Sequence, residues 1–288
     1  MPRGLDHIVH AVRDLDAGAE LYRRLGFTVG ARNRHPWGTH NHIVQFPGFF
    51  IEVLTMAESE KLGDDGISKL FGDFNRRFLE AGEGFSLLIL ESKDAAADAR
   101  AFEAAKIAAS DVLRFEREGK RPDGSAVKVA FSLVFARDAL APAHNFAVCQ
   151  QHYPESFWNP DYQRHANGVT GVAGAVMVAD NPSDHHIFMS ALAGERELLS
   201  SSAGITVTTP RGEIQVVTPA AFSDLFGIAA PNVSEGGRLA ALRLKSSDMN
   251  ATETSLSAGA FSPIRHMGRL IVPPDQALGA ALVFEAAH

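Results

Sequence analysis

Apolar residues along the chain gather into short runs separated by polar, Gly-rich or Pro-rich turns, and the order of these runs repeats. The first run, Leu5–Val12, is rich in β-branched residues and predicts a strand. A helix is expected over Ala17–Leu25, with Asp14 or Asp16 as its N-cap. Gly26 is expected to end it, because glycine readily adopts the left-handed conformation of helix ends. The pattern then predicts three strands, over Phe27–Val29, His42–Phe46 and Phe49–Leu54.

This order of one strand, one helix and three strands recurs along the chain, as expected of a repeated fold. The second cycle is predicted over Phe85–Leu90, a helix Ala95–Lys106, and strands Val112–Glu116, Val127–Phe135 and Phe146–Gln150. The third is predicted over Gly171–Val178, a helix Ser183–Leu192, and strands Gly204–Thr209 and Glu213–Val217. The fourth is predicted over Leu239–Leu244, a helix Ala251–Ala258, and strands Gly268–Val272 and Ala280–Glu285. Four βαβββ modules of one α+β plan therefore fill the chain.

Two segments fall outside the modules. Residues 153–168 are rich in Pro and polar residues and are interpreted as a linker. We therefore expect a first half over residues 1–152 and a second over residues 169–288. Ile67–Ala81 predicts an additional amphipathic helix between the first two cycles.

Composition narrows the classes of function. No stretch approaches the roughly 18 apolar residues of a membrane helix, and the start of the chain lacks the pattern of a secretory signal, so a soluble cytoplasmic protein is expected. The single cysteine, Cys149, excludes an intrachain disulfide and a thiolate zinc cluster. The net charge of −7 is not accompanied by a basic patch, which argues against nucleic acid. A small molecule or another protein chain is the expected partner.

Several motifs carry a family resemblance. Asp6-His7-Ile8-Val9, Leu25–Val29 and Phe50–Val53 resemble the vicinal oxygen chelate superfamily of glyoxalases, bleomycin-resistance proteins and extradiol dioxygenases. The segments 35–41, 149–155 and 165–168, together with Trp158, resemble the glyoxalase-like subgroup of this superfamily. The resemblance implies that the modules pair into two cupped, mostly antiparallel sheets with a divalent metal inside the first. It places His7, from an opening strand, and Glu52, from a closing strand, on that metal, and a homodimer is left open.

The residues themselves also support this pair. His7 and Glu52 each interrupt an apolar strand, and a buried carboxylate is costly unless it is paired or bound to metal. Imidazole and carboxylate together suit Zn, Fe, Mn, Ni or Co. The alternative is that either side chain faces water, because side chains alternate along a strand.

The other modules offer fewer ligands. Matching the helix starts Asp14 and Asp94 puts Leu87 opposite His7, so His152 is considered as a further metal ligand and Gln150 as a substrate contact. A position in or beside the linker explains both equally well. In the third cycle Ala173 and Gln215 stand opposite His7 and Glu52, which suggests that the second half has lost its metal. Glu285 would matter only if the fourth module paired with the first.

A cluster of polar and aromatic residues precedes the strand that is expected to begin at His42. We expect a Gly-containing loop that contacts substrate, with His35 or His42 as acid or base, and with Trp37, His40 and Asn41 as substrate contacts. A polar turn that only leads into the strand is an equal alternative. His185 and His186 are expected on the surface at a helix start, and Cys149 is expected to be a small buried residue.

The leading hypothesis is a metal-dependent, glyoxalase-like lyase or isomerase that acts on a small oxygenated substrate through a metal-stabilised enediolate. Two alternatives remain. The same ligands could support ring-cleaving extradiol dioxygenation, which needs two His and one carboxylate. The cup could instead bind a drug or metabolite without catalysis, which an incomplete ligand set would favour.

Overall fold

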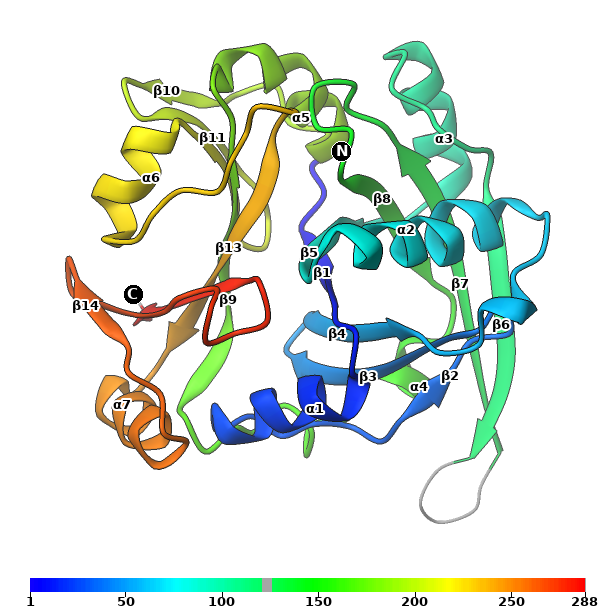
Figure 1. Ribbon diagram of the computed structural model, residues 1–288. Helices are drawn as coiled ribbons and strands as arrows, with labels where there is room; N and C mark the ends of the chain where they lie inside the picture. Colours follow the sequence, from blue (N-terminus) through cyan, green and yellow to red (C-terminus); the bar gives the residue numbers. More distant parts are fainter. Residues whose placement is uncertain (121–125, 288) are drawn as a thin grey trace.

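The computed structural model describes residues 1–120 and 126–287 and contains two curled eight-stranded sheets that lie side by side (Figure 1). The strand order is β2-β3-β4-β1-β5-β8-β7-β6 in the first sheet and β10-β11-β12-β9-β13-β16-β15-β14 in the second. In each sheet two pairs of strands are parallel and the others are antiparallel. The expected α+β fold of two cupped, mostly antiparallel sheets is confirmed.

The elements follow the repeated order along the chain. The first half contains β1 (Leu5–Ala11), α1 (Leu15–Arg24), β2 (Asn33–Arg34), β3 (Thr39–Phe46), β4 (Phe49–Met56), α2 (Phe74–Ala81), β5 (Gly84–Glu91), α3 (Ala95–Ala104), β6 (Leu113–Lys120), β7 (Ala126–Ala136) and β8 (Asn145–Gln151). A short helix, α4 (Pro154–Phe157), lies in the connecting segment. The second half contains β9 (Val169–Val178), α5 (His186–Ala193), β10 (Leu199–Ser201), β11 (Gly204–Thr208), β12 (Glu213–Val217), α6 (Pro219–Phe226), β13 (Arg238–Ser246), α7 (Met249–Ala258), β14 (Ile264–His266), β15 (Arg269–Val272) and β16 (Ala281–Ala286). The division into residues 1–152, 153–168 and 169–288 as domains stays a prediction.

Strand alternation determines which side chains enter the first cup. β1 is parallel to β4, with Val9 opposite Glu52, and β5 is parallel to β8, with Ile89 opposite Ala147. Successive side chains point to opposite faces of a strand. Ile8 on β1 therefore enters the main core, whereas His7 and Val9 face the concave side.

Three apolar clusters hold the fold together. The largest joins the two halves and includes Ile8, Val148, Met177 and Leu244. The concave side of the second sheet is filled by its own apolar residues and by Phe222 and Phe226 of α6. The concave side of the first sheet carries a smaller cluster around Val9, Leu87, Ala147 and Cys149, and it keeps a pocket.

Helix starts were well predicted, and short strands were not. The Asp14 and Asp94 side chains accept hydrogen bonds from the first turns of α1 and α3, which confirms that these modules begin alike. The strand expected over Phe27–Val29 is wrong, because the Thr28 N–H donates to the His165 ring and not to a neighbouring strand, and the short strand β2 comes later. The sequence pattern also missed β10, β14 and α6.

The additional helix over residues 67–81 is present, but it begins as a π-helical turn, Ser68–Asp73, before α2. Asn75 of α2 donates to the Phe71 carbonyl and accepts from the Ser86 hydroxyl on β5, so the helix is tied to the first sheet. In the described part of the chain, every helix is too short or too polar to cross a membrane.

The connecting segment lies against the first sheet. The Gln45 side chain on β3 donates to the Phe157 carbonyl at 2.8 Å and accepts from the Asn159 N–H at 3.0 Å. The rings of Phe157 and Trp158 pack on Phe50 of β4. The linker is thus part of the first cup.

Candidate functional site

A pocket opens on the concave side of the first sheet and contains about 630 Å³ of space free of protein atoms, part of it open to solvent. Its polar lining comprises His7, Asn33, His35, Asn41, Glu52 and Arg117. The remaining wall is largely apolar and aromatic, formed by Trp37, Ile43, Phe50, Ile67, Phe71, Phe115, Phe131, Leu133, Cys149 and Phe157. A concave, mostly apolar site with a few convergent polar groups is typical of small-molecule binding.

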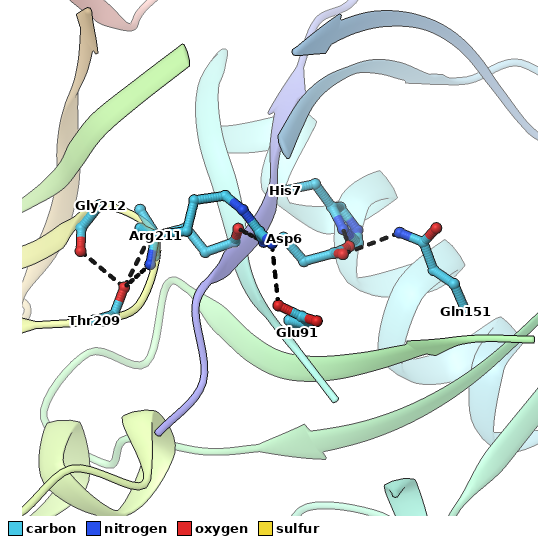
Figure 2. Close-up of polar contacts among 8 residues, drawn as sticks. Asp6, His7, Glu91, Gln151, Thr209, Arg211 and Gly212 are labelled. Atoms are coloured by element: carbon cyan, nitrogen blue, oxygen red, sulfur yellow. Dashed lines mark hydrogen bonds and ion pairs between the residues drawn. The ribbon is translucent and has the colours of Figure 1, made fainter. Parts of the chain in front are cut away.

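His7 is held in one orientation. Its Nδ1 lies 2.6 Å from Oδ2 of Asp6, and the other oxygen of that carboxylate accepts from Gln151 Nε2 at 3.0 Å (Figure 2). The imidazole also stacks on Phe50, with 4.2 Å between ring centroids. A carboxylate at Nδ1 fixes the proton there and leaves Nε2 as the nitrogen able to bind a metal or accept a proton.

Glu52 lies on the neighbouring strand β4 and is 4 % exposed. Burial raises the pKa of its carboxyl, although the nearby charge of His7 and a hydrogen bond from Asn41 act in the opposite direction. That bond, from Asn41 Nδ2 to Glu52 Oε1, measures 2.5 Å. The side-chain amide oxygen of Asn41, Oδ1, is buried and has no hydrogen-bond partner within the described residues. A buried polar atom without a partner is costly, so a bound molecule would satisfy it.

His7 and Glu52 fit a divalent metal, because one could donate an imidazole nitrogen and the other a carboxylate oxygen. Within residues 1–120 and 126–287, no group of three or more His, Cys, Asp or Glu side chains is placed to hold a metal ion. The equivalent strands of the second module place Leu87 and Ala147 where His7 and Glu52 stand. Further ligands would therefore come from substrate oxygens or water.

His35 and Trp37 form one wall of the pocket. Their rings stack with 4.6 Å between centroids, and His35 Nδ1 lies 2.9 Å from the Thr39 hydroxyl. Burial, assisted by the charge of Arg117, lowers the pKa of His35 to about 3. The ring is therefore neutral near pH 7, and its role as acid or base stays a prediction. The indole N–H of Trp37 is buried without an acceptor among the described residues.

Four expected site residues, His40, His42, Gln150 and His152, do not line this pocket, whereas Asn41 does. His40, Asn41 and His42 belong to β3 and not to a loop, because the hairpin with β4 extends to Thr39. His40 bonds Glu58 at 2.8 Å, and His42 Nδ1 lies 2.7 Å from the Gly30 carbonyl. Gln150 accepts from the Ala95 N–H and so supports the start of α3. His152 bonds the Ser132 hydroxyl at 2.7 Å.

Several lining residues were not anticipated from sequence. Asn33 lies on the short strand β2, and Arg117 lies on β6, one residue beyond the strand end expected at Glu116. Alternation along β6 would have placed Arg117 on the same face as Phe115. Phe157 comes from the segment interpreted as a plain linker.

The second cup contains a charge cluster at the corresponding place. Arg243 of β13 donates to Glu213 and Gln215 of β12 at 2.9 Å and to Glu285 of β16 at 2.7 Å. Gln215 pairs with Val176 as Glu52 pairs with Val9, so Gln215 matches Glu52 as expected. The same register puts Gly174, and not Ala173, in the place of His7. Glu285 also pairs with Arg269 and stays within the second sheet.

Two further expectations can be compared with the structure. Cys149 is buried as expected, and burial raises the pKa of its thiol well above the usual value. The expectation that His185 lies on the surface is wrong. It is 3 % exposed and pairs through Nδ1 with the buried Asp138 carboxylate of the first half at 2.5 Å, whereas His186 is exposed.

The cupped sheets, with a His and a Glu on adjacent inner strands, define a vicinal oxygen chelate protein. A family model described as a glyoxalase-like domain matches residues 5–192, and the chain belongs to this glyoxalase-like family. Its members typically bind a divalent metal. No individual curated protein matches the sequence.

Solved structures share the fold at low sequence identity. A hypothetical protein from Staphylococcus aureus is 12 % identical with a TM-score of 0.69, covering 99 % of this chain and 100 % of its own. A mutant 4-hydroxymandelate synthase from Streptomyces coelicolor is 13 % identical with a TM-score of 0.57, covering 100 % and 94 %. A 2,2',3-trihydroxybiphenyl 1,2-dioxygenase from Sphingomonas wittichii is 13 % identical with a TM-score of 0.52, covering 100 % and 91 %. These similarities concern the fold alone.

Proposed function

We propose that this protein is a metal-dependent enzyme of the glyoxalase-like type, a lyase or isomerase that acts on a small oxygenated substrate in the first cup. The observation that supports it best is the Asp6–His7 pair beside the buried Glu52 in one aromatic pocket. His7 and Glu52 would hold the ion, which could be Zn, Fe, Mn, Ni or Co. A bound ion would polarise a substrate oxygen.

The chain's own residues would provide the remaining functions. Asp6 orients His7, and Asn41 holds one oxygen of Glu52, so both groups are preorganised. The raised pKa of Glu52 suits a carboxyl that exchanges a proton with a carbon acid near neutral pH. The aromatic walls would exclude water and leave Asn41 Oδ1 to bind a donor group of the substrate.

Metal analysis of the purified protein tests this proposal. We expect about one equivalent of divalent ion in the wild type, loss of the ion in His7→Ala and Glu52→Ala, and retention in the control His186→Ala, which changes an exposed histidine. If the wild type holds no metal and titration with Zn²⁺, Mn²⁺, Fe²⁺, Ni²⁺ and Co²⁺ shows no binding, the enzymatic proposal fails.

A second candidate is a protein that binds a drug or metabolite without catalysis. It is favoured by Leu87 and Ala147, which leave the pocket with two metal donors from this chain. A metal-free protein that binds small aromatic molecules would support it. Ring-cleaving dioxygenation has less support, because the described residues offer no second His beside His7 and Glu52. The cytoplasmic location and the homodimer stay predictions.

A further inference from the structure

Arg117 lines the pocket and has no carboxylate partner among the described residues. Its Nη2 donates to the Asn33 amide oxygen at 3.0 Å, and no described Asp or Glu lies within ion-pair distance of it. Burial lowers the pKa of the guanidinium, although arginine stays charged at any physiological pH. A partly buried cation without a counter-charge is unfavourable.

The neighbouring charges on β6 behave differently. Arg114 pairs with Glu116 at 3.0 Å, and Glu116 also pairs with Lys128, all on the exposed face of the hairpin. Alternation turns Arg117 to the other face, beside Phe115 and the pocket. The charges on the outer face are therefore paired with one another, whereas the charge of Arg117 on the inner face has no ion-pair partner in the part of the chain that the structure describes.

Arg117 also lies where the pocket adjoins a second cavity. Asn33, Ile43, Arg117 and Phe157 line the pocket and also line a wider outer cavity bounded by the connecting segment. Glu52 contributes the sole carboxylate among the described residues that line the pocket, and Glu155 lines the outer cavity only. A ligand in the pocket would therefore face the Arg117 guanidinium, the aromatic walls, and His7 and Glu52 together.

We propose that the molecule bound in this pocket is an organic acid with an apolar, ring-sized body, whose carboxylate pairs with Arg117 while its body packs against Trp37 and Phe115. A guanidinium binds a carboxylate through two parallel hydrogen bonds, and Arg117 has nitrogen donors beyond the one that contacts Asn33. This inference deepens the proposed function and rests on the pocket being its site, but not on the metal.

The test compares matched probes. Phenylacetate and its neutral amide, phenylacetamide, are titrated against the wild type with calorimetry and tryptophan fluorescence. The chain has two tryptophans, Trp37 in the pocket wall and Trp158 against Phe50, so fluorescence reports binding at this site. We expect the acid to bind about 10- to 100-fold more tightly than the amide, the range of one charged hydrogen-bonded pair.

Variants connect this preference to Arg117. Arg117→Met keeps the length of the side chain and should abolish the preference, whereas Arg117→Lys should keep part of it. Arg114→Met, on the outer face of the same strand, should leave it unchanged. Equal binding of acid and amide by the wild type, binding of neither, or a preference that survives in Arg117→Met would overturn the inference. Each result is independent of metal content, so the failure of one proposal is distinguishable from that of the other.

Discussion

Arg211, in the turn between β11 and β12 (Figure 2), donates from Nη1 to the Leu5 carbonyl at 2.9 Å, and the Leu5 N–H donates back to the Arg211 carbonyl at 3.0 Å. Nη2 of the same guanidinium reaches Glu91 at 3.2 Å. The second half therefore holds Leu5, the residue that immediately precedes Asp6 and His7, through two hydrogen bonds. The second half thereby helps to fix β1, the strand that carries His7.

Arg211→Ala should lower the free energy of unfolding by about 1–2 kcal/mol, because a partly buried backbone carbonyl loses its donor, while the half-exposed pair with Glu91 contributes little. It should also weaken binding of metal at His7. Urea unfolding and metal titration measure the two effects. Arg164→Ala, which removes an exposed pair with Asp161, is the control and should change neither. An unchanged stability of Arg211→Ala would contradict the assigned role.

Asp6→Asn should weaken metal binding by about 10- to 100-fold, because the carboxylate that fixes the His7 tautomer is replaced by an amide of the same shape. Metal titration followed by calorimetry measures the change. The thermal midpoint should shift much less than the affinity. Asp16→Asn on the exposed side of α1 provides the control. If Asp6→Asn and Asp16→Asn bind metal equally well, Asp6 does not orient the ligand.

Glu52→Gln should stabilise the metal-free protein relative to the wild type near neutral pH. The pKa of Glu52 is raised in the folded state by burial, so the folded protein holds a proton that the unfolded chain releases. The stability of the wild type therefore falls as pH rises from the usual carboxyl range through the raised value. Urea unfolding with chelator from pH 4 to pH 8 should show the advantage of Glu52→Gln growing with pH. A constant difference across this range would rule out the raised pKa.

Buried histidines should make the fold sensitive to acid. Burial lowers the pKa of His10 and His165 to about 4 and that of His144 to about 3. The unfolded chain gains protons below about pH 6.5 that the folded protein does not, so stability falls as pH decreases from about 6.5 toward 4. Each histidine contributes up to about 1.4 kcal/mol per pH unit.

The variant His10→Gln tests this contribution, since it should reduce the slope of stability against pH in that range. His10 bonds Tyr22 and the Leu278 carbonyl, so the variant will also be less stable at pH 7, and the slope is the informative quantity. His186→Gln should leave the slope as it is. Equal slopes in wild type and His10→Gln would show that His10 is protonated as easily in the folded as in the unfolded protein.

The sequence predicted the module plan because its signals are local. An Asp that caps a helix and an apolar run of the right length act over a few residues, as Asp14 and Asp94 demonstrate. The same signals put His7 and Glu52 on the opening and closing strands of one module. Parallel pairing of these strands then brings both side chains into one pocket.

Features that depend on distant contacts were less predictable. Whether residues 39–42 form loop or strand depends on pairing with β4, and the polar residues there resemble a turn. His185 was expected at the surface because its partner, Asp138, is 47 positions away in sequence. Arg117 and Phe157 reach the pocket from elements whose ends the hydrophobic pattern did not define. Local patterns predicted His7 and Glu52, whereas Arg117 and Phe157 are brought to the pocket by tertiary packing.

The connecting segment, residues 153–168, has a second role, because its Phe157 and Trp158 pack on Phe50, the ring on which His7 stacks. A polypeptide that ended at residue 152 would keep both proposed metal donors and lose this side of the cavity. The length of the segment between the two repeats therefore sets the position of one wall of the pocket as well as the distance bridged between the halves. Insertions or deletions there are expected to move that wall.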